Sequence, residues 1–177
     1  MTAALPETLT LDRTATPIGT ALVVTDEAGT LRAFNWTDYE DAMSAWIAKR
    51  YPQAMRREAA GPLRPVFDAY FAGQVDAFEA VAWYGAGTAF QQTCWDALCT
   101  IPAGATWSYA QLAERIGRPT AVRAVGLANG SNPVALVVPC HRVIGSNGSL
   151  TGYGGGLHRK RWLLEHEGAS FRTPLAA

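Results

Sequence analysis

The residues most able to do chemistry are the Pro139-Cys140-His141-Arg142 run near the carboxyl end of the chain. The thiolate is the nucleophilic form of cysteine, and a free thiol with a pKa of about 8.5 is only slightly ionised at neutral pH. His141 is the adjacent base that can take the thiol proton, because side chains at a proline-initiated bend can converge. Glu165 or Glu167 would then orient the imidazole. The pattern predicts a cysteine nucleophile with an activating histidine.

Other interpretations of Cys140 stay open when the residues are taken alone. A buried cysteine packs like a small apolar residue and need not react. A metal site is disfavoured, because the three cysteines and three histidines show no Cys-x-x-Cys pair and no zinc-type spacing. We therefore expect no metal and no cofactor. A cysteine hydrolase would need an oxyanion hole and a path for water. The run from Gly152 to Gly156 lacks the Lys-Ser/Thr end of a phosphate loop, so we interpret it as flexible backbone beside a substrate.

Two apolar segments contain a cysteine or lead to one. Residues 134–138 form a continuous apolar run that predicts a buried strand ending at Pro139. Residues 88–98 carry apolar side chains at helical spacing, which predicts a helix with Cys94 on its core face. Cys99 is also expected to be packed rather than reactive.

A pair of short helices precedes this region. Ser108 and Gln111 have the spacing of a capping box and predict a helix over residues 109–116 that stops at Gly117. A second helix is expected over residues 119–130, with Pro119 in its first turn. Two short helices around a glycine turn are typical of a helix-turn-helix, whose second helix usually meets DNA. The residues assigned to DNA on this helix are Arg123 and its small neighbours Ala121 and Ala124.

The amino-terminal half has the pattern of a sheet with helices. Residues 18–24 and 30–36 are rich in β-forming residues and predict a hairpin. Residues 37–51 predict an amphipathic helix that is acidic at its start, basic at its end and stopped by Pro52. Residues 63–72 predict a second helix that ends at Gly73. Residues 78–84 predict a further strand.

The Gly85-Ala86-Gly87 run is the expected domain boundary. It divides the chain into an amino-terminal domain of residues 1–85 and a carboxyl-terminal domain of residues 86–177. The first domain carries seven basic and eleven acidic residues, and the second carries eight basic and four acidic residues. The carboxyl-terminal half is therefore the part expected to meet a polyanion, because positive surface steers nucleic acid.

Composition limits the class of protein further. The chain has 177 residues, 49% of them hydrophobic, with 15 basic and 15 acidic residues, which is the profile of a folded globular protein. An odd number of cysteines favours a reducing compartment. No segment has the pattern of a signal peptide or a membrane span. We expect a cytoplasmic protein that associates with the nucleoid when on DNA and has no membrane partner.

These motifs together resemble the O6-alkylguanine-DNA alkyltransferase family. The resemblance rests on Pro139-Cys140-His141-Arg142-Val143, Arg123-Ala124-Val125-Gly126, Asn132-Pro133, Gly152-Tyr153-Gly154-Gly155-Gly156 and the closing Leu163-Leu164-Glu165-His166-Glu167-Gly168. It covers most of residues 88–168, whereas residues 1–85 match only in layout. The implied fold is α/β with two domains: an antiparallel, ribonuclease-H-like sheet with helices, then a mostly helical, winged-helix-like domain with a helix-turn-helix.

The resemblance also implies roles for single residues. Cys140 would irreversibly accept the alkyl group from guanine O6, or from thymine O4, and the protein would act once. His141 and Glu167 would ionise the thiol through water and hydrogen bonds, Asn132 would brace the turn, and Tyr109 would donate a proton to the leaving guanine. Tyr153, the carbonyl of Val143 and Gly154 would line the base pocket, and Gly154, where some relatives carry a hydroxyl residue, would widen it.

The implied partner is double-stranded DNA that contains alkylated bases. Arg123 would fill the gap left by an extruded nucleotide, with the second helix in the minor groove and Ala121 and Ala124 allowing close approach. The protein is expected to be monomeric in solution. A module that binds lesions and recruits other repair factors is the alternative, and a cysteine hydrolase is a more distant one.

Overall fold

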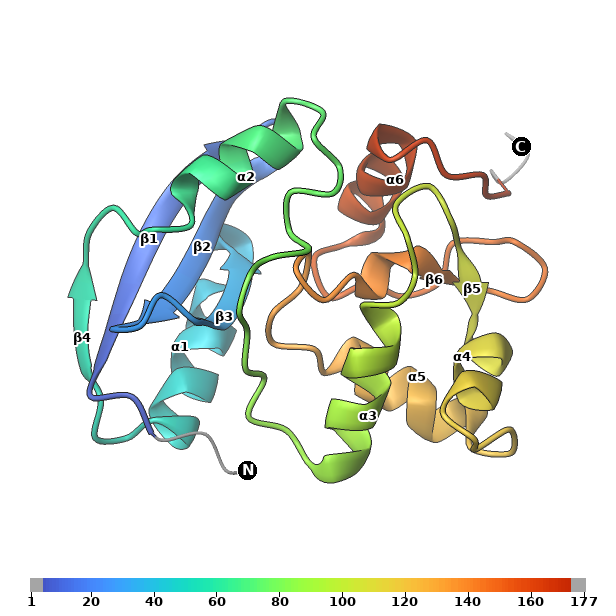
Figure 1. The fold of residues 1–177 in the computed structure, drawn as a ribbon, viewed down its shortest axis with the longest axis horizontal. Coiled ribbons are helices and arrows are strands. Elements are labelled where there is room, and N and C mark those ends of the chain that lie inside the picture. The colour runs from blue at the N-terminus through green and yellow to red at the C-terminus, as the bar shows by residue number, and fades with distance from the viewer. Residues whose placement is uncertain (1–4, 173–177) are drawn as a thin grey trace. The chain divides into compact units, whose positions relative to one another are not determined.

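The computed structural model describes residues 5–172. Its internal contacts divide into two units, one of Met1–Ala86 with Pro133–Val137, the other of Gly87–Asn132 with Val138–Ala177. Over the described residues this is a mixed α/β protein with one four-stranded sheet and six α-helices (Figure 1). The mixed α/β class predicted from the sequence is confirmed.

The first unit is built on the four-stranded sheet. Its strands are β1 (Thr8–Thr16), β2 (Gly19–Asp26), β3 (Leu31–Trp36) and β4 (Met55–Glu58), in the order β3-β2-β1-β4. The predicted hairpin is present as the antiparallel pair β2 and β3, and β1 is antiparallel to β2. The expectation of a wholly antiparallel sheet is wrong at one edge, because β4 pairs with β1 in parallel.

The two predicted helices of this unit pack on opposite faces of its sheet (Figure 1). A short 3-10 turn (Thr37–Tyr39) leads into α1 (Glu40–Arg50), which packs on a core cluster with Leu9 and Val24. Helix α2 (Arg64–Phe71) lies on the other face, where Phe67 stacks on Phe34 with ring centroids 5.6 Å apart. Alternate side chains of a strand point to opposite faces, so both helices bury apolar sheet surface.

The strand expected over residues 78–84 is not formed. This segment is a series of turns with one bridge, between Leu31 and Trp83. Its apolar residues serve the core instead: the ring of Phe78 lies 4.9 Å from that of Phe67 and 4.6 Å from that of Tyr70. The short apolar run here therefore indicates burial in the core and does not indicate a strand.

The second unit holds the remaining helices. They are α3 (Ala89–Leu98), α4 (Tyr109–Arg115), α5 (Val122–Gly130), a 3-10 turn η2 (Cys140–Arg142) and α6 (Leu157–His166), with a small parallel pair of β5 (Trp107–Ser108) and β6 (Val143–Ile144). The predicted capping box at Ser108 is present, and Thr88 makes a second one. Pro119 lies in a turn before α5, so the second helix begins later than expected.

Two predictions about cysteine environments had different outcomes. Cys94 is fully buried on α3, as expected for a core position. Cys99 follows the helix and is exposed, so the expectation that it is packed is wrong. No helix within residues 5–172 is long and apolar enough to cross a membrane.

Candidate active site

The chain reaches Cys140 through a tight turn. The strand predicted over residues 134–138 is not formed, because Leu136 has φ of 71°, a left-handed conformation that interrupts an extended chain. The segment is apolar because its side chains are buried. Pro139 then opens η2, where the Cys140 amide donates to the carbonyl of Val138 at 2.8 Å. Cys140 is therefore the first residue of a rigid turn and is 5% exposed.

His141 and Glu167 form a buried pair. The imidazole Nε2 lies 3.0 Å from Glu167 Oε1, and neither side chain is more than 1% exposed. Arg142 binds the same carboxylate with two nitrogens, Nε to Oε2 and Nη2 to Oε1, both at 2.8 Å. Its Nη1 also donates to the carbonyl of Ile101 at 2.6 Å. Glu167 is thus clamped between a histidine and a bidentate arginine.

The charges of this cluster follow from its contacts. Burial alone would raise the pKa of the Glu167 carboxyl, but His141 and Arg142 hold that pKa well below its usual range. Burial lowers the pKa of His141, although Glu167 opposes this. We infer an ionised Glu167 and a neutral His141 at neutral pH. An ionised carboxylate only accepts hydrogen bonds, so Nε2 carries the imidazole proton and Nδ1 carries the lone pair.

His141 Nδ1 is the ring nitrogen that does not contact Glu167. It is buried and has no hydrogen-bond partner among the described residues. Burial raises the pKa of the neighbouring Cys140 thiol, while a hydrogen bond with Asn132 and the charge of Lys160 oppose this rise. Burial therefore favours the protonated thiol, and the adjacent residue His141 carries a ring nitrogen with a free lone pair that can accept the thiol proton.

Two asparagines hold the turn that carries the cysteine. Asn132 Nδ2 donates to the carbonyl of Val138 at 2.8 Å, directly before Pro139. Asn129, near the end of α5, donates from Nδ2 to the carbonyl of Cys140 itself at 3.4 Å. Asn132, expected to brace the turn, makes a hydrogen bond to it. The contact of Asn129 with the turn was not predicted from the sequence. Asn129 follows Val125 by four residues, and this helical spacing on the buried face of α5 is the sequence signal that could have found it.

Lys160 was also missed by the sequence prediction. Its side chain is fully buried, and Nζ donates to the carbonyls of Val143 at 2.6 Å and Thr151 at 2.9 Å. Burial lowers the pKa of Lys160 to about 8, and Cys140 opposes this shift. Lys160 lies four residues before the buried Leu164 on α6, and a cation on the apolar face of a helix is a recognisable signal.

Two of the residues expected to line a base pocket, Tyr153 and Val143, contact this cluster. The ring of Tyr153 is perpendicular to that of His141 with centroids 6.5 Å apart, and its hydroxyl is buried without a partner among the described residues. Val143 is buried and its carbonyl accepts from Lys160. A Cβ at Gly154 would meet nothing within 4 Å, so open space surrounds it. Tyr109 is joined through Thr151, whose hydroxyl donates to the Tyr109 oxygen at 3.1 Å.

The residues expected to meet DNA are on the opposite end of α5 from Asn129. Ala121 precedes the helix, and Arg123 and Ala124 are exposed in its first turn. No hydrogen bond within residues 5–172 joins them to the cysteine cluster. Helix α5 packs on α4 at Gly126, where an added Cβ would lie 3.8 Å from the Tyr109 ring. One short helix therefore carries exposed DNA candidates at its start and a brace for the Cys140 turn at its end.

Fold and site together define a mixed α/β protein with a buried cysteine beside a histidine–carboxylate pair. No group of three or more metal-ligating side chains is found in the part of the chain that the structure describes. The cluster provides what a cysteine nucleophile requires, namely a thiol, a neutral base and an anion that orients the base.

The chain is similar to known proteins over most of its length. Residues 89–169 match the family described as 6-O-methylguanine DNA methyltransferase, DNA binding domain. The methylated-DNA–protein-cysteine methyltransferase of Shigella flexneri is 47% identical over 161 residues, which cover 89% of this chain and 94% of that protein.

Solved structures agree with the sequence match. The crystal structure of Mycobacterium tuberculosis O6-methylguanine methyltransferase is 40% identical with a TM-score of 0.75, covering 95% of this chain and 96% of that one. A structure of Mycobacterium tuberculosis OGT in complex with DNA is 40% identical with a TM-score of 0.74, covering 90% and 92%. The chain therefore belongs to the methylated-DNA–protein-cysteine methyltransferase family, and the resemblance seen in its motifs is confirmed.

Proposed function

We propose that this protein repairs DNA by direct reversal, moving an alkyl group from guanine O6, and also from thymine O4, onto Cys140. The observation that carries the proposal is the buried Cys140, followed directly by a His141 whose Nε2 lies 3.0 Å from Glu167 Oε1. This arrangement occurs in a chain that belongs to this family. The product is a thioether, which has no proton to lose and no leaving group that the site activates. Each chain would therefore act once.

The proton relay follows from the resting charges. The Cys140 proton moves to Nδ1 of His141, directly or through water, and Glu167 stabilises the imidazolium that forms. The sulfur then attacks the alkyl carbon, so that a sulfur–carbon bond forms as the carbon–O6 bond breaks. The guanine keeps the electron pair of the broken carbon–O6 bond and takes a proton from Tyr109. The thiol has released one proton and the guanine has taken up one, so the protons balance. Lys160 and Asn132 favour the thiolate through charge and hydrogen bonding.

The base pocket is proposed to lie around Tyr153, Val143 and Gly154. Tyr153 supplies an aromatic ring next to His141, and a flat ring suits a flat base. The Val143 carbonyl already accepts from Lys160, and its second lone pair can accept from a base. The open space at Gly154 supports a pocket that admits alkyl groups larger than methyl.

DNA is proposed to bind through α4 and α5 acting as a helix-turn-helix of a winged-helix-like domain. The exposed Arg123 and Ala124, with Ala121 before them, support a close approach to the minor groove. A reacting atom inside a duplex is out of reach of a buried thiol, so the nucleotide is extruded at a cost of a few kcal/mol, and Arg123 fills its place. The DNA complex of the Mycobacterium tuberculosis relative supports this partner.

The amino-terminal domain is proposed to be a ribonuclease-H-like support, with residues 1–85 and 86–177 as the two domains and the monomer as the active form. The separation of internal contacts into two units near residue 86 supports this division, although residues 133–137 group with the first unit.

Stoichiometry distinguishes this function from lesion binding alone. A duplex with one O6-methylguanine, in excess over the protein, should lose one lesion per chain and no more, and Cys140→Ser should repair none. Lesion binding without any loss of O6-methylguanine would favour a recruiting module. Repeated repair by one chain would contradict the proposal.

A further inference from the structure

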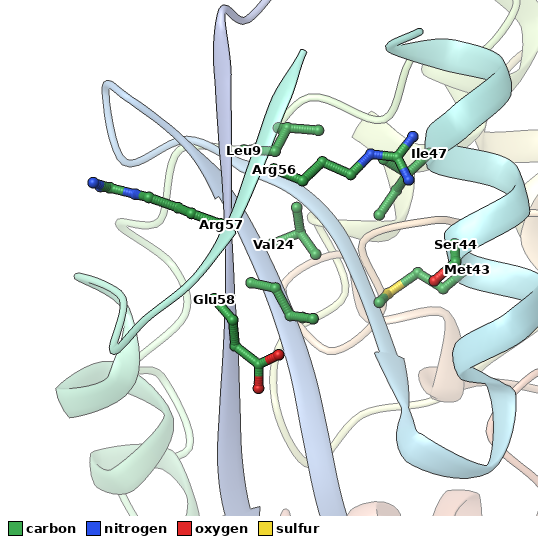
Figure 2. A pocket seen from close by; sticks show the side chains of 9 residues that line it. Leu9, Val24, Met43, Ser44, Ile47, Arg56, Arg57 and Glu58 are labelled. Carbon is green, nitrogen blue, oxygen red and sulfur yellow. The ribbon is translucent and has the colours of Figure 1, made fainter.

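A pocket lies in the first unit, which contains none of the residues named above as reactive. It has a volume of about 280 Å³ and opens between the sheet and helix α1 (Figure 2). Its floor is apolar and is formed by Leu9, Leu11, Val24, Met43 and Ile47. These residues belong to or border the core cluster under α1, but Leu11 is only partly covered. The core beneath the pocket is therefore largely covered, and Leu11 is the floor residue that keeps exposed apolar surface.

The strand register decides which charged side chains face this opening. Strand β4 pairs in parallel with β1, so that Arg56 lies beside Leu9 and Glu58 beside Leu11. Neighbours in register point to the same face of a sheet, and the residues between them point to the other. Figure 2 shows the Arg56 side chain reaching across the pocket towards α1, whereas that of Arg57 points away. Arg57 Nε donates to Thr10 Oγ1 on that other face.

Arg56 is the cation at this opening that has no partner. Glu58 is held by Arg13 at 2.6 Å, and Arg13 also binds Glu40 of α1 at 2.5 Å. The Arg56 side chain makes no hydrogen bond or ion pair with any residue of the described chain. The other polar residues that line the pocket are Ser44 of α1 and Arg57, whose side chain points away from it (Figure 2). The pocket thus combines an apolar floor with one unpaired guanidinium at its mouth.

We propose that this pocket binds a small carboxylate with an unbranched apolar tail. The tail would cover the exposed part of Leu11. The carboxylate would pair with Arg56, whose planar guanidinium matches carboxylate geometry. The volume is just below the range of about 300–1,000 Å³ for ligand pockets, which favours a medium-length tail. Glu40 and Glu58, which both bind Arg13, fix the orientation of the ligand. Their negative charges repel a carboxylate from the end of the pocket opposite Arg56. This site is independent of Cys140 chemistry.

Methionine methyl groups give a direct readout of occupancy. The chain has three methionines. Met43 lines the pocket, whereas Met55 belongs to the set of β4 side chains that face away from it. Carbon-13 methyl labelling and titration with octanoate should shift the Met43 signal saturably and leave Met55 in place. Each added buried methylene, from hexanoate to octanoate, should tighten binding about fourfold.

Charge and side-chain controls test the role of Arg56. Arg56→Gln should weaken octanoate binding about fivefold, the effect of one exposed ion pair, and Arg57→Gln is the matched control that should not. On the wild type, 1-octanol should bind more weakly than octanoate, and octylammonium more weakly still. The proposal is overturned if Met43 does not shift up to the solubility limit, or if octanoate and 1-octanol bind equally. A Met43 shift that depends on protein concentration alone would assign the pocket to a second copy of the chain and would also overturn it.

Discussion

Glu167→Gln is the substitution that probes the proton relay most cleanly. It keeps the size of the side chain but removes the negative charge that faces His141 at 3.0 Å and Arg142 at 2.8 Å. In the proposed reaction the imidazole becomes positively charged when it takes the thiol proton. The variant should therefore destabilise this state more than the resting one, and alkyl transfer should slow.

The size of the effect can be worked from the geometry. Two opposite charges about 4 Å apart interact by about 4 kcal/mol at an effective dielectric of about 20. Arg142 shares the carboxylate, so we assign about half, ~2 kcal/mol, to the imidazolium. Solvent screening is small because His141 and Glu167 are both buried. Since about 1.4 kcal/mol is a factor of ten in rate, the reaction should slow about 30-fold.

The assay is the rate of reaction with free benzylguanine, which needs neither DNA nor base extrusion. Glu165→Gln is the matched control, because Glu165 is exposed two residues away. The variant rate should also climb with pH towards the raised pKa of the Cys140 thiol, because hydroxide must then replace the weakened base. Thermal unfolding checks that the loss of the Arg142 ion pair has not unfolded the variant. Equal rates and equal pH profiles for the two variants would refute the relay.

Three further substitutions test separate parts of the site. Arg123→Ala should keep its rate with benzylguanine and lose rate on duplex DNA, because only the duplex needs extrusion; equal loss on both would contradict that role. Lys160→Met should slow both reactions by removing contacts to Val143 and Thr151. Gly154→Ser should leave stability unchanged, because nothing lies within 4 Å, and should lower the benzyl rate more than the methyl rate. An unchanged ratio of the two rates would remove Gly154 from the pocket.

Lys160 also predicts a pH dependence of stability. Its pKa is about 8 in the folded protein and 10.5 when unperturbed, so between these values the folded state binds fewer protons than the unfolded state. The free energy of unfolding should therefore rise with pH over that window, by up to about 3 kcal/mol relative to Lys160→Met. Denaturant unfolding of both proteins at pH 7.5 and 10 measures this difference. An equal change in the free energy of unfolding between the two pH values in both proteins would show that burial does not shift the pKa of Lys160.

The elements that could be predicted are those whose signals are local. The hairpin of β2 and β3, helix α3 and the capping box at Ser108 depend on residues within a few positions of one another. Strand β1 was missed because its inward positions include Asp12 and Thr14, which do not look like a core. Asp12 is buried only because Arg64 and the amide of Gly61 reach it from about fifty residues away.

In the candidate site, too, only the features with local sequence signals could be predicted. Cys140 and His141 are adjacent, so their chemistry could be predicted from residue types alone. The partners of Lys160 lie nine and seventeen residues away, at two carbonyls with no signature in the sequence. The resting charge of the thiol could not be predicted either, because it depends on how completely the fold buries it. Residue types identify the reactive groups, and only tertiary packing sets their protonation.

The account depends on Cys140 being the atom that receives the alkyl group. Peptide-resolved mass spectrometry after reaction with excess O6-methylguanine duplex measures this for Cys94, Cys99 and Cys140 separately. The account predicts one added methyl group per chain, found on Cys140 and absent from the other two cysteines. A methyl group on exposed Cys99 instead, or an unmodified protein that has nevertheless repaired the duplex, would contradict it.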